Sequence, residues 1–167
     1  NTNGTNLIAI GNQAGYSGST AIKNISIGDS AGYNTTGSNN LNLGHEAGKS
    51  NTSGANNMFI GYQTGADSTG AHTGSFNMFI GNQAGYKTEG GSRNMFIGNQ
   101  AGTNNVSGAK NIYMGNYAGY IGTISSKNIF IGTTDSDSHG IGHFNTGNLN
   151  IAIGSNVAVF NTSGKRN

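Results

Sequence analysis

A short motif recurs nine times along the chain, and its apolar and variable positions alternate. Each copy ends in a glycine, and an aliphatic residue or methionine stands one and three positions before that glycine in all nine copies. The nine glycines, called landmark glycines below, are Gly11, Gly28, Gly44, Gly61, Gly81, Gly98, Gly115, Gly132 and Gly154. A period of two over so few residues predicts a very short β-strand with one buried face. We expect the two aliphatic rows to form that buried face.

The spacing of the landmark glycines predicts how these strands assemble. It ranges from 16 to 22 residues and is most often 17. One such unit is too poor in apolar side chains to fold alone, but stacked units bury a continuous core. We therefore predict an all-β parallel β-solenoid of about nine coils of 16–22 residues, with residues 1–167 as a single repeat domain. The longest coil contains an insertion at 133–149, and no segment has the apolar spacing of a helix.

Glycine and asparagine recur at fixed offsets from the strands. Asn stands four positions before the landmark glycine in eight of the nine copies, and Ala-Gly commonly follows three and four positions after it. Glycine at a fixed offset predicts a corner with positive φ or close backbone approach, and the Asn amide can bond to nearby backbone. The residues expected to define the structural repeat are Asn57, Asn77, Asn94, Gly61, Gly81 and Gly98.

An aromatic residue lies between the two aliphatic positions in five successive copies. These residues are Phe59, Phe79, Phe96, Tyr113 and Phe130. Neighbouring strand residues point to opposite faces, so aliphatic rows inside would place the aromatic stripe outside. A stripe this long is expected to be covered by further copies of the chain. We predict that the five residues form a homo-oligomer interface; the alternative is an aromatic strip that binds a ligand.

Composition excludes several classes of protein. The chain has 30 Gly, no Pro and no Cys, only 8% of its residues are charged, and its net charge is +2. The absence of Cys excludes disulfides, thiolate catalysis and Cys-ligated zinc. Apart from the adjacent Lys165 and Arg166, Lys and Arg occur singly along the sequence, which argues against a nucleic-acid partner. No apolar run is long enough to predict membrane insertion of this segment.

The candidate chemistry is limited to two places. Asp29 and Glu46 fall at neighbouring positions of adjacent coils and could approach as a glycosidase pair does, although we interpret them as surface charges. The loop at 135–143 contains Asp135, Asp137, His139 and His143, a partial set of calcium or transition-metal ligands. We interpret it as a polar surface loop. The sequence thus predicts no catalytic residue, no metal site and no cofactor.

The segment Asn-Met-Phe-Ile-Gly-Asn-Gln-Ala-Gly, at 77–85 and again at 94–102, resembles the head repeats of trimeric autotransporter adhesins and similar repeats in bacteriophage tail-fibre shafts. The resemblance covers essentially the whole chain. It implies a left-handed β-roll, three chains around a common axis, and an extracellular place on a cell surface or virion. With three chains, the interface expected at the aromatic stripe from Phe59 to Phe130 is a homotrimer interface. The implied partner is a surface receptor or glycan.

These observations lead to one expected function and one alternative. We expect a structural or adhesive segment of an extracellular homotrimeric fibre that mediates attachment to a surface without catalysis. The repeat pattern continues to both ends of the sequence, so we also expect a segment of a longer fibrous protein. The alternative is a β-solenoid spike that cleaves carbohydrate with surface carboxylates.

Overall fold

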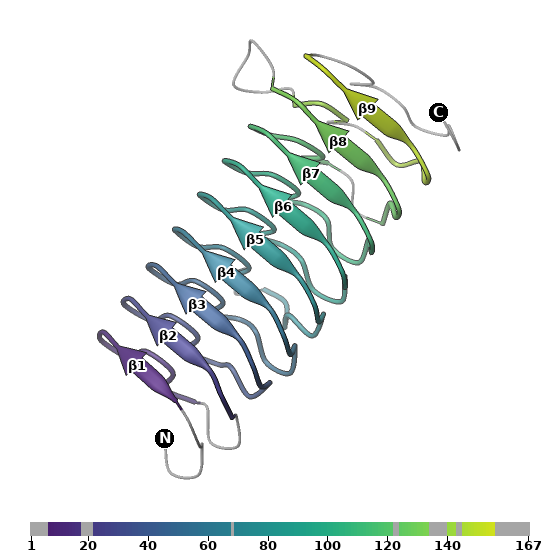
Figure 1. The fold of residues 1–167 in the computed structure, drawn as a ribbon. Coiled ribbons are helices and arrows are strands. Elements are labelled where there is room, and N and C mark those ends of the chain that lie inside the picture. Colours follow the sequence, from purple (N-terminus) through teal and green to yellow (C-terminus); the bar gives the residue numbers. More distant parts are fainter. Residues whose placement is uncertain are drawn as a thin grey trace.

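The computed structural model describes residues 7–17, 22–67, 69–121, 124–133, 140–142 and 145–155. Within them the chain forms nine strands of three residues, which make one parallel sheet in chain order (Figure 1). The strands are β1 (Ile8–Ile10), β2 (Ile25–Ile27), β3 (Leu41–Leu43), β4 (Met58–Ile60), β5 (Met78–Ile80), β6 (Met95–Ile97), β7 (Ile112–Met114), β8 (Ile129–Ile131) and β9 (Ile151–Ile153). Every predicted strand is therefore present.

The strands stack at the same register throughout the sheet. Each first strand residue pairs with the first residue of the next strand, as in Met78 with Met95 and Met95 with Ile112. The fold is an all-β parallel β-solenoid with coils of about 17 residues, as predicted. The nine stacked strands match the number of repeats in the sequence, and the rod makes about seven turns. Residues 18–21 and 156–167 fall outside the described residues.

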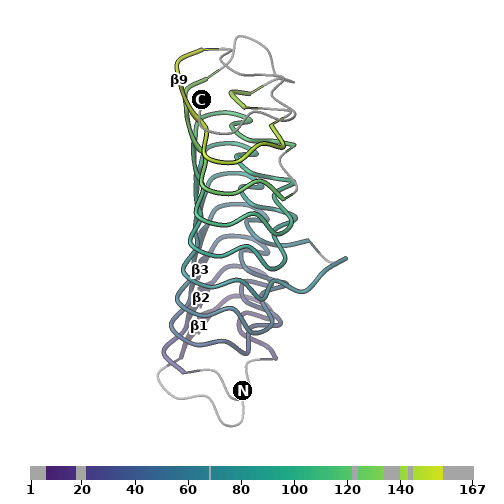
Figure 2. The same ribbon diagram turned by 90° about the vertical axis from the view of Figure 1, so that its right-hand side faces the viewer.

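Each coil consists of one strand and a longer return segment. Figure 2 shows the strands along one side of the rod and the return segments along the other. The return segments also bond from coil to coil, as in Gly48 N–H to the Thr64 carbonyl oxygen at 2.8 Å and Gly85 N–H to the Ala101 carbonyl oxygen at 2.9 Å. Backbone bonding therefore continues around the coil, beyond the three strand residues.

The interior of the coil contains the aromatic row, contrary to the sequence prediction. Phe59, Phe79, Phe96, Tyr113 and Phe130 are each 0% exposed within a single chain. The rings stack at the coil spacing, with centroids 4.8 Å apart for Phe79 and Phe96 and 4.9 Å apart for Phe96 and Tyr113. The predicted orientation of both rows is wrong, because the aliphatic rows face outward. The five aromatic side chains have no surface left to form an interface with another chain.

The return segment explains why the aromatic face is the inner one. Glycine lies against each ring: a Cβ added to Gly85 would come within 2.5 Å of the Phe79 ring, and one added to Gly102 within 2.6 Å of the Phe96 ring. The narrow interior thus accepts one large side chain per coil only where a residue without a side chain faces it. A three-residue strand places one residue on this inner face and two on the outer face.

A ladder of buried asparagines joins the coils beside the strands. In the middle of the rod, Asn94 N–H donates to Asn77 Oδ1 at 2.9 Å, and Asn94 Nδ2 donates to the Gly108 carbonyl oxygen at 2.8 Å. Asn57 and Asn77 repeat this pattern, so the predicted bonding of Asn to backbone is present. Each side chain satisfies polar groups of two coils at once.

The landmark glycines form a second column. Gly61, Gly81 and Gly98 have φ values of 128°, 134° and 137°, in agreement with the positive φ predicted for these corners. A Cβ at Gly98 would lie 2.4 Å from the carbonyl oxygen of Gly115 in the next coil. The corner therefore requires glycine both for its backbone conformation and for the close stacking of the coils.

Candidate interaction surfaces

The outer face of the sheet is a double row of aliphatic side chains. The first and third residues of all nine strands are half-buried or exposed, and none of these eighteen is buried within one chain. Exposure is greatest at the ends of the sheet, with Ile10 at 59% and Ile153 at 65%. A continuous apolar surface of this kind is characteristic of an interaction site. Sequence reasoning missed it because it assigned these rows to the core; the Ala-Gly corner, which faces the rings, was the signal that could have placed them.

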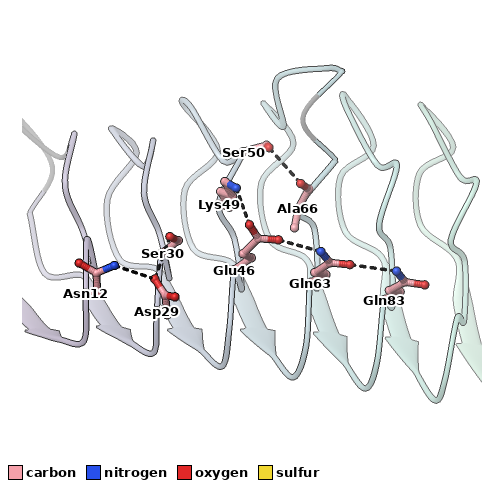
Figure 3. A network of polar contacts seen from close by, with 9 residues as sticks. All are labelled: Asn12, Asp29, Ser30, Glu46, Lys49, Ser50, Gln63, Ala66 and Gln83. Atoms are coloured by element: carbon pink, nitrogen blue, oxygen red, sulfur yellow. Dashed lines mark hydrogen bonds and ion pairs between the residues drawn. The ribbon is translucent and has the colours of Figure 1, made fainter.

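A polar ladder runs along the corner that follows the strands. Figure 3 shows Glu46 accepting a bond from Gln63 Nε2 at 2.7 Å, and Gln63 in turn accepting one from Gln83 at 3.0 Å. The ladder continues to Gln100, which donates to Gln83 at 3.2 Å. Lys49 Nζ lies 2.5 Å from Glu46 Oε1 as an ion pair. The side-chain amides thus bond mainly with one another along the rod.

The same view places the two carboxylates considered for glycoside cleavage. Asp29 accepts bonds from Asn12 at 3.4 Å and Ser30 at 3.1 Å, whereas Glu46 bonds toward the following coil (Figure 3). The hydrogen bond and charge of Lys49 keep the pKa of Glu46 below its usual value, although burial opposes them. A general acid needs a raised pKa. No feature of this pair favours a role in acid catalysis.

One titratable side chain is buried among the rings. His72 is 1% exposed and lies against Phe59 and Phe79, with ring centroids 5.2 and 6.0 Å away. Its Nδ1 is 2.7 Å from the Thr88 carbonyl oxygen, while its Nε2 has no partner. Burial lowers the pKa of His72 to about 4, although its backbone bonds oppose the shift. His72 is therefore neutral at pH 7, and no pattern in the sequence indicates that it is buried.

The candidate metal loop lies mostly outside the part of the chain that the structure describes. This applies to Asp135, Asp137, His139 and His143. Among the described residues, no group of three or more His, Cys, Asp or Glu side chains could hold a metal ion. The same residues contain no helix of the length and apolarity needed to cross a membrane.

Comparisons with known proteins add no relative to this picture. No protein-family model, curated protein or solved structure matches the chain. The parallel β-solenoid and its surfaces are therefore the basis for any proposal about function.

Proposed function

We propose that this chain is a structural and adhesive segment of an extracellular homotrimeric fibre. The single observation that carries the proposal is the outer face of the sheet, where eighteen aliphatic side chains are exposed or only half-buried in one chain. The segment extends the fibre and presents surfaces for attachment, and the proposal assigns it no catalysis. The trimer contact moves from the aromatic row to the two aliphatic rows.

The energetics support association through this face. Burying an aliphatic side chain completely contributes about 1.5–3 kcal/mol, and these side chains are only partly buried in one chain. Covering all of them would contribute on the order of 10 kcal/mol per chain. This is comparable with the free-energy penalty of bringing chains together. The number three comes from the resemblance to adhesin heads and tail-fibre shafts, whose β-rolls pack around a common axis.

The test is the mass of the assembled protein in solution, compared with that of a double variant of the outer face. We expect native mass spectrometry to give a trimer for the parent chain and mainly monomer for Ile80→Ser with Ile97→Ser. Both side chains point outward from β5 and β6, so the coil should keep its circular dichroism spectrum. The matched control, Asn82→Ser with Asn99→Ser, changes exposed residues at the neighbouring corner and should remain trimeric.

Two outcomes would contradict the proposal. One is a parent chain that stays monomeric at high micromolar concentration. The other is a folded Ile80→Ser, Ile97→Ser variant that stays trimeric with unchanged melting, because the aliphatic rows would then not be the contact.

A further inference from the structure

Three cations form a column along one edge of the outer sheet face. Arg93, Lys110 and Lys127 stand two positions before β6, β7 and β8, and all three are exposed. Their φ values are 61°, 61° and 60°, and the strands that follow them pair in register. The three side chains therefore leave the backbone in the same direction, one coil apart, at a spacing of about 4.8 Å. We call this set the cation column.

The fold does not require these charges. The same position in other coils holds Lys23, Asn39, Asn56, Phe76 and Leu149 with nearly the same φ, so neutral residues are also accepted there. The ion pair formed within the described residues joins Lys49 to Glu46, and no described carboxylate neutralises the column. Like charges at neighbouring positions of paired strands are destabilising. An unneutralised column therefore indicates a ligand that supplies the anions.

The edge continues beyond the column as a track for an extended ligand. In the coil before Arg93, the ring of Phe76 is 57% exposed, with the guanidinium carbon of Arg93 5.7 Å from its centroid. Nearer the N-terminus, the edge forms a shallow groove of about 350 Å³ lined by Lys23, Asn39, Asn56 and the aliphatic side chains beside them. Positive charge, an aromatic face and exposed amides thus follow one another along a single line.

We infer that this edge binds a linear anionic polysaccharide. Sulfate or carboxylate groups would lie against the cation column, a sugar ring would pack on Phe76, and hydroxyl groups would bond to Asn39 and Asn56. A duplex nucleic acid fits less well, because it needs a broad basic face and this edge presents one narrow line on a chain of net charge +2. The inference names the class of partner to which the proposed fibre would attach, and it rests on the proposed function for this attachment role. The binding track itself lies within one chain.

The experiment measures binding of the whole chain to heparin, a linear sulfated polysaccharide, and to neutral dextran over a range of salt concentrations. The test variant is Lys110→Asn with Lys127→Asn, since Asn39 and Asn56 already occupy this position in other coils. The matched control is Lys49→Asn with Lys87→Asn, which removes the same charge away from the track. We expect heparin affinity to fall about tenfold in the test variant and its salt dependence to weaken, since fewer counterions are released. The control should change little, and dextran should not bind.

Three results would overturn the inference. They are no binding of heparin by the parent chain at low salt, an equal loss in both variants, and tighter binding of a single-stranded DNA oligonucleotide than of heparin. Native mass spectrometry of the same samples separates this inference from the proposed function. A monomeric parent chain that binds heparin through the column would contradict the trimer and leave the polysaccharide track in place.

Discussion

The middle and the N-terminal part of the rod have the same backbone arrangement, but different side chains fill their interiors. From β4 to β8 the inner strand residue is Phe or Tyr, with stacked rings such as Tyr113 and Phe130, whose centroids are 5.1 Å apart. In β2 and β3 the inner residues are Ser26 and Asn42, joined by a hydrogen bond of 3.1 Å. The register and the outer aliphatic rows are the same in both regions. The interior therefore tolerates different chemistry, whereas the outer face stays apolar in every coil.

This difference separates two requirements on the sequence. The interior has to be filled, either by rings against glycine or by small polar residues that bond to one another. The outer rows make a much smaller contribution to the core of one chain, yet all nine coils have an aliphatic residue or methionine at both outer positions. The contact with other copies of the chain that we propose would explain this uniformity.

The largest expected effect is at the ring stack. Phe96→Ala removes a ring packed between Phe79 and Tyr113 and should lower the free energy of unfolding by about 3–5 kcal/mol through lost burial and an unfilled cavity. Ser26→Ala in the polar region leaves the buried Asn42 Nδ2 without this acceptor and should cost less, about 1–3 kcal/mol. Urea unfolding followed by circular dichroism measures both changes. Equal losses would show that the two interiors are equally important to stability.

The second prediction concerns pH and also distinguishes the middle of the rod. The pKa of His72 is lowered from 6.5 to about 4 in the folded chain, so the unfolded chain binds the proton more readily. The contribution of His72 to the free energy of unfolding is fully present above pH 6.5. It is lost as the pH falls toward 4, and the total loss is about 3 kcal/mol. Hydrogen exchange should show the coils around His72 opening before those of β2 and β3.

Two variants check that His72 is responsible for this loss. His72→Gln cannot titrate in this range, and its stability should be nearly constant between pH 6.5 and 4. His45→Gln changes an exposed ring stacked on Tyr62 and should keep the loss of the parent chain. A loss that persists in His72→Gln would assign the effect to other groups.

The smallest effect is expected where the two regions are alike. Asn40 in the polar part and Asn94 in the aromatic part make the same ladder contacts. Replacing either with Ala leaves the buried backbone N–H of Asn57 or Asn111 without its acceptor, whereas the Gly54 or Gly108 carbonyl keeps a second donor. Each change should cost about 1–3 kcal/mol. Thermal unfolding would compare the two variants, with the exposed Asn99→Ala as the control. A large difference between them would mean that the ladder depends on the neighbouring interior.

The repeat pattern was sufficient to predict the strands, their parallel stacking and the glycine corners. It could not decide which face of a strand points inward. Met78, Phe79 and Ile80 alternate, but alternation defines two faces without saying which is buried. Which face is buried depends on Gly85, which lies against the Phe79 ring only in the closed coil. The two apolar residues of each strand outnumber the one between them, and this led the prediction to the wrong face.

Features that occur in a single coil were harder to predict. His72 belongs to a coil three residues longer than the usual 17, and no other coil has a matching histidine that could have indicated burial. The cation column left a signal, since Arg93, Lys110 and Lys127 are separated by one coil length each. Read along the chain they are isolated charges, and only the register of the coils brings them together.

The direction of the backbone bonding has a mechanical consequence. The strands lie across the rod, and the bonds that join them point from one coil to the next (Figure 1). A pulling force along the rod would therefore act on successive coils in series, so that rupture starts at the weakest coil. Three chains held together through their sheet faces would share that force at every level. The apolar face that we propose for association would then also determine how much tension the rod withstands.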